Sequence, residues 1–340
     1  MSSFISSVVV LAAGQGKRMK SELPKVLHQV CGRPMLLHVL AATRTVAALR
    51  TVVVLGHGYE QVLPYLPADC VVARQEDQRG TGHAVLAAAE HILEGDVLVL
   101  PGDTPLVTAE ALEALVREHK ESHSVATVLT MMMDDPSGYG RIVRFPDGSV
   151  ARIVEHRDAD EDERAIREVN SGMLILPVPL ALDILATLGT DNDQGEIYLT
   201  DVVAGLRQRG ERVGAAIVAD PRLVLGVNSR VELAQAEALL GERIKARWMR
   251  DGVTIIDPAS TIIEAEVTIE PDVIVRPFTV LAGETTVAKG SDIGPSSTLI
   301  DARIGEECVL PHCYVRSTAV ETGARLRPFT SLDGSPEKPS

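Results

Sequence analysis

Short apolar runs alternate with amphipathic stretches over the first two thirds of the chain. Runs rich in β-branched residues predict buried strands, and apolar residues spaced three and four apart predict helices. The predicted strands are Val8 to Leu11, Thr51 to Leu55, Cys70 to Ala73, Val97 to Leu100, Val125 to Thr130, Val169 to Leu176 and Val213 to Val218. The predicted helices are Arg33 to Ala47, Gly82 to His91, Ala109 to Ser122, Tyr198 to Arg209 and Arg230 to Arg250. This order predicts a doubly wound α/β sheet, whose ligands lie beyond the carboxyl ends of its strands.

The pattern changes between residues 139 and 156. Two runs of alternating apolar and polar residues meet at Pro146, Asp147 and Gly148, which predicts a β-hairpin. The charged run HRDADEDERAIRE begins at the end of this hairpin. We interpret that run as a solvated surface helix or loop rather than a metal site.

Apolar residues recur every six positions beyond Asp251, with a slip of one residue after Leu299. The series consists of Ile269, Val275, Leu281, Val287, Ile293, Leu299, Ile304, Leu310, Val320, Leu326 and Leu332. A small or β-branched residue follows most of them by four positions. This period predicts a parallel β-helix of about four coils, with three hexads per coil, whose exposed ends need a cap or a partner. The closing residues GSPEKPS predict a disordered tail.

Composition narrows the possible partners. A chain of 340 residues favours two domains, and 45% apolar residues supply a full core. Only 3% of the residues are aromatic, which argues against base-stacking platforms. The net charge of −14 argues against nucleic acid or an anionic membrane as a partner. Any phosphate site must therefore be a local cationic pocket.

The cysteines predict no metal site and no disulfide framework. Only two of the four lie close in sequence, and a zinc site would need a second pair. We interpret Cys31, Cys70, Cys308 and Cys313 as reduced thiols in a cytoplasmic protein. The N-terminus lacks the basic region of a signal peptide. No segment reaches the roughly 18 apolar residues that a membrane span needs.

The first predicted strand leads into a basic, glycine-bearing loop. Small residues allow a nucleotide to approach the backbone, and here they are Ala12, Ala13, Gly14 and Gly16. The positive charges that would match phosphate charge are those of Lys17, Arg18 and Lys25. Two common phosphate motifs do not fit, because the loop has no Gly-Lys-Ser/Thr triplet and Met19 stands where GxGxxG needs its third glycine. Nucleotide binding is favoured over a tight turn with surface lysines.

Polar residues follow other predicted strands. Asp103 is placed to hold a divalent metal over a bound phosphate, since Thr108 already serves as the cap of the next helix. Asn228 would be interpreted as a cap if taken alone, but its amide oxygen also suits such a metal. Gln75 offers the donor and acceptor that a pyrimidine edge requires, and Gly80 leaves room for a base.

The hairpin is followed by groups that suit sugar hydroxyls. Glu155 supplies a carboxylate at its end, and Asn170 supplies an amide shortly afterwards. His83, which lies in the polar loop after Gln75, is interpreted as structural.

Taken together, the motifs resemble a known family. LAAGQGKRM, LPKVLH, QRGTGHA, GDTPL, GYGRIV, IVEH, NSGMLI, GEIYLTD and GVNSR occur in the order and spacing of bacterial N-acetylglucosamine-1-phosphate uridylyltransferases of the GlmU type. The resemblance covers residues 5 to 335. It implies a Rossmann-like, doubly wound nucleotidyltransferase domain followed by a short left-handed β-helix.

The resemblance also implies roles for individual residues. Arg18 and Lys25 would neutralise phosphates, with Arg18 nearer the departing pyrophosphate, and Asp103 and Asn228 would bind Mg²⁺. Gly140, Glu155 and Asn170 would hold N-acetylglucosamine; Leu11, Ala12, Ala13, Gly14, Gln75, Gly80, Thr81 and Gly102 would bind the uridine nucleotide. The implied reaction joins UTP and N-acetylglucosamine 1-phosphate to give UDP-N-acetylglucosamine and pyrophosphate. The sugar phosphate is already anionic and needs no general base, so catalysis is positioning plus charge neutralisation.

The predicted division of the chain follows from these patterns. Residues 1–229 form the nucleotidyltransferase domain, 230–250 a linker helix, 251–332 the β-helix and 333–340 the tail. Longer members of the family use further coils for an acetyltransferase that acts on glucosamine 1-phosphate with acetyl-CoA. That second activity is expected to be absent from this chain, and the short β-helix is expected to form a homotrimer.

Three rival functions stay open. One is nucleotidyl transfer to another sugar, for example glucose 1-phosphate with UTP or dTTP. A second is a non-catalytic protein that binds sugar nucleotides, against which the joint presence of Arg18, Lys25, Asp103 and Asn228 counts. A third is an acyltransferase run by the β-helix, against which the small number of coils counts.

Overall fold

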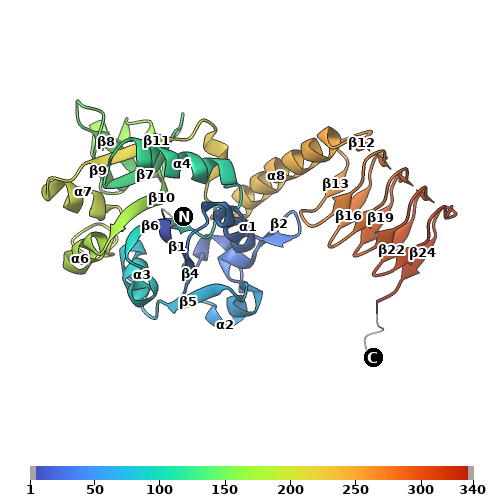
Figure 1. Cartoon of the computed structure of the whole chain (residues 1–340), viewed down its shortest axis with the longest axis horizontal. Coiled ribbons are helices and arrows are strands. Elements are labelled where there is room, and N and C mark those ends of the chain that lie inside the picture. Colours follow the sequence, from blue (N-terminus) through green and yellow to red (C-terminus); the bar gives the residue numbers. More distant parts are fainter. Residues whose placement is uncertain (1–4, 336–340) are drawn as a thin grey trace. The chain divides into compact units, whose positions relative to one another are not determined.

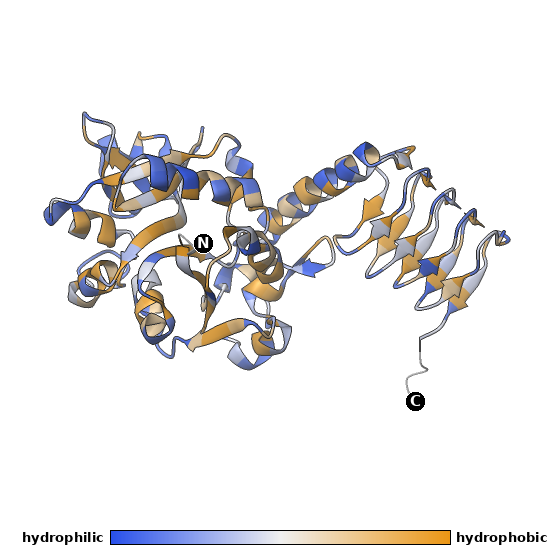
Figure 2. Ribbon diagram, viewed as in Figure 1, coloured by the Kyte–Doolittle hydropathy of each residue, from blue (hydrophilic) through white to orange (hydrophobic). Residues whose placement is uncertain are grey.

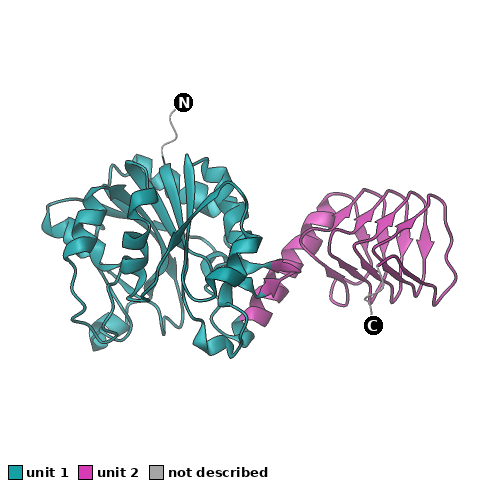
Figure 3. Cartoon of the chain, turned by 90° about the horizontal axis from the view of Figure 1, so that it is seen from below, with its two compact units in different colours: residues 1–28, 34–232 teal, residues 29–33, 233–340 magenta. Residues whose placement is uncertain are grey.

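The computed structural model describes residues 5–335, which fall into two compact units. Unit 1 comprises Met1–His28 and Pro34–Glu232, and unit 2 comprises Gln29–Arg33 and Leu233–Ser340. Figure 3 shows the two units in different colours. The predicted tail, 333–340, lies mostly outside the described residues.

A central sheet organises unit 1, with strand order β11-β7-β10-β6-β1-β4-β5 (Figure 1). Its strands are β1 (Ile5–Ala12), β4 (Arg50–Leu55), β5 (Cys70–Arg74), β6 (Gly95–Pro101), β7 (Ala126–Met132), β10 (Glu168–Val178) and β11 (Val213–Ile217). These are the predicted strands, with bounds that differ by a few residues; most are longer than predicted, whereas β11 is one residue shorter. They are predominantly hydrophobic in Figure 2, as expected for strands buried on both faces.

Strand β10 makes the sheet mixed rather than wholly parallel. It runs antiparallel to both β6 and β7. The predicted hairpin, β8 (Arg141–Arg144) and β9 (Val150–Val154), lies between β7 and β10 in sequence, and β8 pairs with β10. The chain thus returns from the hairpin in the opposite direction, and the hairpin becomes an extension of the sheet.

Helices cover both faces of the sheet in unit 1. They are α1 (Met35–Thr43), α2 (Tyr59–Val62), α3 (Thr81–Ala87), α4 (Ala109–Glu121), α5 (Glu161–Arg164), α6 (Leu180–Thr187) and α7 (Asp201–Gln208). Short 3-10 turns lie at Lys17–Met19, Lys25–Leu27, Arg44–Val46, Leu63–Tyr65, Ala89–His91 and Pro221–Val224. Alternate residues of β1 enter different cores, with Val9 in one and Val8 and Val10 in the other. This two-sided burial fits the doubly wound prediction.

Two local predictions about helix ends can be compared with the structure. Thr108 caps α4 as expected, because its Oγ1 accepts a hydrogen bond from the Ala111 amide at 3.3 Å. The helix predicted from Arg33 begins only at Met35. The reason is that Arg33–Pro34 pairs as β3 with β2 (Gln29–Val30), a small hairpin that the sequence pattern did not indicate.

Unit 2 contains most of the predicted linker helix, α8 (Arg230–Arg250), and the β-helix. The strands form parallel sheets with orders β12-β15-β18-β21, β13-β16-β19-β22-β24 and β14-β17-β20-β23 (Figure 1). Their bounds are β12 (Thr254–Ile255), β13 (Ile262–Ile263), β14 (Thr268–Ile269), β15 (Ile274–Val275), β16 (Val280–Ala282), β17 (Thr286–Val287), β18 (Asp292–Ile293), β19 (Thr298–Ile300), β20 (Arg303–Ile304), β21 (Val309–Leu310), β22 (Tyr314–Arg316), β23 (Ala319–Val320) and β24 (Ser331–Asp333). This architecture matches the predicted left-handed β-helix.

The six-residue series fills the interior of the β-helix. Its members from Ile269 to Val320 are buried, whereas Leu326 and Leu332 are half-buried because they belong to the last described coil. Cys308 and Cys313 also lie inside, where their thiols donate to the Glu321 and Pro311 carbonyls at 3.1 Å. Both cysteines therefore serve as small core residues.

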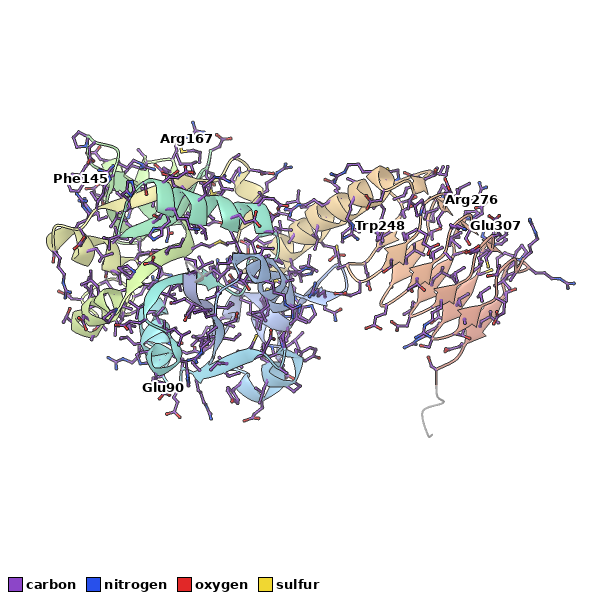
Figure 4. All side chains as sticks on the ribbon, viewed as in Figure 1. Glu90, Phe145, Arg167, Trp248, Arg276 and Glu307 are labelled. Carbon is purple, nitrogen blue, oxygen red and sulfur yellow. The ribbon has the colours of Figure 1, made fainter. Side chains whose placement is uncertain are left out.

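Arg276 and Glu307 are among the charged side chains on the outside of unit 2 (Figure 4). Arg276 forms two hydrogen bonds of 2.6 Å with the carboxylate of Asp292, one coil further on. Trp248 lies on α8, and the Arg247 guanidinium stands 4.4 Å from the centre of its ring. These contacts fasten neighbouring coils and the end of the helix.

The β2–β3 hairpin belongs to unit 2 although its sequence lies near the N-terminus. The Cys31 amide donates to the carboxylate of Glu237 at 2.6 Å, and the Cys31 carbonyl accepts from the Ala265 amide at 2.9 Å. Burial and the neighbouring Glu237 raise the pKa of the Cys31 thiol to about 12. The thiol is therefore protonated and inert at neutral pH.

Candidate active site

A cavity of about 840 Å³ opens at the carboxyl edge of the unit 1 sheet. Three of its contributors follow parallel strands, namely the loop after β1, Gln75 after β5 and Asp103 after β6. The hairpin β8–β9 and the strand β10 supply the opposite part of the lining. The cavity thus lies where a doubly wound sheet places its ligands.

The loop after β1 is held open by backbone contacts on both sides. The Leu11 carbonyl accepts from the Gly102 amide at 2.9 Å, and the Ala13 carbonyl accepts from the His57 amide at 3.3 Å. Gln78 also donates to the Ala13 carbonyl, at 2.6 Å. A Cβ at Gly14 would meet no atom within 4 Å, so the backbone there faces free space. A ligand can therefore approach this main chain closely.

Gln75 is buried, and its amide nitrogen is fully engaged. Nε2 donates to the Gly80 carbonyl at 3.0 Å and lies 3.1 Å from Nδ1 of His83, which must accept because the amide nitrogen has only hydrogens to give. The amide oxygen stays available to a ligand. His83 does not line the cavity, and its contact with Gln75 fits the structural role predicted for it.

Gly80 fixes the start of α3. Its φ is +102°, and a Cβ there would come within 2.6 Å of the Ile197 carbonyl oxygen. Thr81 follows, and its Oγ1 accepts from the Leu199 amide at 3.1 Å. Only glycine fits this turn, which brings the Gln75 loop against the segment that precedes α7.

Two acceptor oxygens converge on one ammonium group at another side of the cavity. Lys25 Nζ contacts Asp103 Oδ2 and donates to Asn228 Oδ1 at 2.6 Å. The Val227 amide donates to the Asp103 carbonyl at 2.9 Å, which joins the two loops directly. The Glu232 carboxylate accepts a hydrogen bond from the backbone amide of Asn228, so the first turn of α8 also holds this loop in place. The pair Asp103 and Asn228 is thus built to surround a cation.

Gly140, Glu155 and Asn170 form a single cross-strand row. In the next row of the sheet, Arg141 pairs with Val154 on β9 and with Val169 on β10. Strand β8 lies between β9 and β10 and is antiparallel to both, so Gly140 lies opposite both other residues. The Gly140 carbonyl accepts a hydrogen bond from the Asn170 backbone amide at 2.8 Å. A Cβ at Gly140 would stand 3.5 Å from the Glu155 carboxylate. Strand register explains why residues so distant in sequence share one wall.

The carboxylate of Glu155 lies in an acidic environment. Burial raises its pKa most, Thr200 opposes this by donating to Oε1 at 3.0 Å, and Asp201, Asp158 and Glu196 raise the pKa further. Burial and Asp158 also raise the pKa of Asp201. This end of the cavity therefore disfavours further negative charge and suits neutral hydroxyl groups.

The structure brings the predicted site residues together with one exception. All of them line the cavity except Gly102, which is buried behind the β1 loop. Several other residues that line the cavity have no predicted role, including Gln15, Gln78, Tyr139, Ser171, Glu196 and Thr200. All six lie within the quoted motifs LAAGQGKRM, QRGTGHA, GYGRIV, NSGMLI and GEIYLTD. That position in the motifs was the available signal.

Metal-ligating groups are sparse elsewhere. Within residues 5–335 no three or more His, Cys, Asp or Glu side chains gather in a way that could hold a metal ion, and all four cysteines are free. No helix in the same range is long and apolar enough to cross a membrane. The oxygens of Asp103 and Asn228 are therefore the best candidates for binding a cation.

Comparison with known proteins agrees with this geometry. Residues 8–174 match the model of the MobA-like NTP transferase domain. A solved structure described as UDP-glucose pyrophosphorylase complexed with UDP-glucose covers 70% of this chain and 99% of its own, with a TM-score of 0.58 and 18% identity. At that identity the likeness establishes the fold alone.

Relatives named Bifunctional protein GlmU match nearly the whole chain. The protein of Caldanaerobacter subterraneus subsp. tengcongensis is 44% identical over 95% of this chain and 71% of its own length. That of Brevibacillus brevis is 46% identical over 94% and 70%, and that of Thermobifida fusca is 45% identical over 93% and 67%. The chain belongs to the GlmU family, and it is an enzyme with a nucleotidyltransferase domain.

Proposed function

We propose that this chain transfers a uridylyl group from UTP to N-acetyl-α-D-glucosamine 1-phosphate, with release of pyrophosphate. One observation carries the proposal. A single cavity joins an open backbone loop, a pair of oxygens around a cation and a row of hydroxyl-binding groups. Those are the parts that a nucleotide, its phosphates and a sugar require.

The nucleotide is assigned to the wall formed by the β1 loop and Gln75. The free amide oxygen of Gln75 suits the N–H of a uracil ring, and Gly80 keeps the neighbouring turn clear of a side chain. The backbone from Leu11 to Gly14 would run along the ribose and the first phosphate. The position of the α-phosphorus is then fixed between this loop and the Asp103 side of the cavity.

Asp103 and Asn228 fit a divalent cation, because their oxygens already converge on one positively charged group, the Lys25 ammonium. Mg²⁺ commonly takes one or two protein oxygens and completes its shell with phosphate oxygens and water. We therefore assign these two side chains as its ligands. When bound, the ion supplies positive charge at the phosphates undergoing transfer.

Lys25 and Arg18 supply the remaining charge. Lys25 would leave Asp103 and Asn228 as they take the metal, and its ammonium would turn to the phosphates. Arg18 is exposed at the cavity wall, where it would neutralise the departing pyrophosphate. The phosphate oxygen of the sugar attacks the α-phosphorus in line and carries its own negative charge. No side chain has to accept a proton.

The row of Gly140, Glu155 and Asn170 would hold the sugar. The Glu155 carboxylate accepts hydrogen bonds from hydroxyl groups, and the Asn170 side chain can both donate and accept. Gly140 leaves the space between them open. We assign the selection of N-acetylglucosamine over glucose to this row of residues.

Other predictions made from the sequence accompany this proposal. A cytoplasmic location and a homotrimer formed through the β-helix remain predictions. So does the functional division at residues 229 and 250.

The test is pyrophosphate release from UTP or dTTP with a panel of sugar 1-phosphates, with and without EDTA. We expect release with UTP and N-acetylglucosamine 1-phosphate, and its loss when EDTA removes the metal. A preference for glucose 1-phosphate or dTTP would keep the reaction class and replace the substrate. No release with any pair would contradict the proposed function.

A further inference from the structure

Arg141 is the largest side chain that is almost completely buried in the described part of the chain. It lies on β8 and is 1% exposed. No carboxylate within residues 5–335 forms an ion pair with it. Burial and then the nearby Arg164 lower the pKa of its guanidinium, and the charge of Asp135, which forms no ion pair with it, opposes this shift. An unpaired buried cation is costly, so packing alone gives no reason for an arginine at this position.

Its hydrogen bonds reach three separate segments. Nη1 donates to the Tyr139 carbonyl, Nη2 lies 3.2 Å from His156 Nδ1, and Nη2 also donates to the Arg164 carbonyl at 3.4 Å. Arginine has only hydrogens to give, so His156 must accept with Nδ1 and carry its proton on Nε2. Nε of Arg141 is buried without a partner. The side chain thus gives up one possible hydrogen bond while it reaches these acceptors.

Two of these partners flank the row assigned to the sugar. Tyr139 directly precedes Gly140, and His156 directly follows Glu155. The backbone of Arg141 itself pairs with Val154 and Val169, the neighbours of Glu155 and Asn170. One residue therefore contacts the chain on either side of Gly140 and Glu155 and adjoins Asn170 through the sheet.

We propose that Arg141 is a positioning residue for the sugar, which sets the distance between Gly140 and Glu155 by holding Tyr139 and His156 from behind. The identity of the sugar rests on the proposed function, but the positioning role concerns the wall itself. Arg141 does not line the cavity and touches no substrate in this scheme. Its loss should weaken sugar binding and leave nucleotide binding intact.

The decisive variants are Arg141→Met and Arg141→Lys, compared in KM and kcat for each substrate. We expect Arg141→Met to raise KM for the sugar 1-phosphate at least tenfold and to change KM for UTP less than threefold. Arg141→Lys should recover part of the loss, because an ammonium can reach the Tyr139 carbonyl but cannot span both partners.

Arg144→Met is the matched control. Arg144 lies on the same strand, and its guanidinium pairs with Glu168 instead. This change removes an ion pair and the same number of charges, so it reports any general effect on the sheet. We expect both KM values to stay within threefold of the parent enzyme.

Two direct measurements separate failure of this inference from failure of the proposed function. Calorimetry compares binding of UDP-N-acetylglucosamine, UDP-glucose and UTP to each variant, independently of turnover. Nitrogen-15 shifts of His156 report whether the Nε2–H tautomer is lost in Arg141→Met.

Selective loss of sugar-nucleotide binding, together with loss of that tautomer, supports the inference even if the parent enzyme transfers no uridylyl group. The inference would be overturned if a folded Arg141→Met protein lost affinity equally for the sugar nucleotides and for UTP. It would also be overturned if the affinity for the sugar nucleotides were unchanged. If the parent enzyme binds UTP and neither sugar nucleotide, the inference is overturned together with the proposed function.

Discussion

Buried polar side chains serve different purposes in the two units. In the β-helix, Thr285, Ser291 and Ser297 are fully buried, and their hydroxyls donate to backbone carbonyls at 2.6, 2.9 and 2.6 Å. In unit 1, Gln75 is buried with only its amide nitrogen engaged. These three hydroxyls of the β-helix complete their own scaffold, with the buried Thr279 hydroxyl as an exception that has no partner, whereas unit 1 keeps bonding capacity for a ligand.

The geometry of pairing explains this difference. Val275 in the β-helix pairs with Ile255 and Ile293, one coil away on each side. Val9 of β1 pairs with Val52 and with Val99, which come from distant parts of the sequence. Repetition gives each coil of the β-helix nearly the same surroundings. Long-range pairing brings unlike loops to one edge, and that is where a site with several kinds of group can form.

The largest expected effect is the difference between two variants, each of which exchanges one carboxylate for an amide, one in each unit. Asp103→Asn removes the charge assigned to the metal, and we expect turnover to fall about 1,000-fold or more. Asp292→Asn removes the partner of Arg276 and should leave turnover within about twofold, since exposed ion pairs contribute little. The measurement is pyrophosphate release, combined with Mn²⁺ binding followed by electron paramagnetic resonance.

Normal Mn²⁺ binding by Asp103→Asn would remove this residue from the metal site. A large loss of turnover in Asp292→Asn would show that the β-helix contributes to the chemistry, which would break the contrast between the units.

A smaller effect is expected from shortening one core leucine in each unit. Leu100 on β6 and Leu299 on β19 are both fully buried, so each change to alanine should cost about 2–5 kcal/mol. Because coils contact only their neighbours, Leu299→Ala should loosen unit 2 and spare uridylyl transfer. Leu100→Ala lies just before Asp103 and should reduce both stability and transfer.

Hydrogen exchange resolved by segment, measured beside activity, checks this pair. The contrast would be contradicted if Leu299→Ala abolished transfer while the amides of β1 and β6 kept their protection.

The smallest effect concerns the charge of Glu155. Its raised pKa means that the folded state favours the neutral carboxyl, so this group's contribution to stability is complete below the unfolded pKa and is lost as pH rises through the folded pKa. Glu155→Gln removes that dependence. We expect the melting temperature of the variant, relative to that of the parent, to increase from pH 4 to pH 8. We also expect KM for the sugar 1-phosphate to rise by roughly tenfold.

Glu168→Gln is the control for this change. Glu168 pairs with Arg144, so its amide variant should lose stability at neutral pH and keep its KM for the sugar. A Glu155→Gln protein that is less stable than its parent at pH 8 would contradict the expected direction of the stability change.

Much of the fold follows from residue spacing. The bounds of α8 and the buried series of the β-helix were predictable because each depends on a short local period. The β2–β3 hairpin was not predictable, since strands of two residues carry no alternation. The antiparallel direction of β10 depends on where the hairpin joins the sheet, which no local pattern records.

The site divides in the same way. The position of Asp103 after a strand was evident from local pattern. Asn228 was a candidate ligand by its side-chain chemistry, but only the fold brings its loop to Asp103. Arg141 was overlooked because an arginine in an alternating hairpin predicts an exposed side chain. Its burial depends on the turn at Tyr139 and on α5, both of which are brought over it by tertiary structure.

The β2–β3 hairpin has a consequence for fragmentation and grafting. Because Gln29–Arg33 belongs to unit 2, a single protease cut after Glu232 would not yield a complete second unit. The fragment 233–340 would keep Glu237 and Ala265 but lose the main-chain groups of Cys31 that bind them. A chimera that transplants this β-helix onto another enzyme must therefore carry residues 29–33 as well, so the graft needs two separate stretches of the chain.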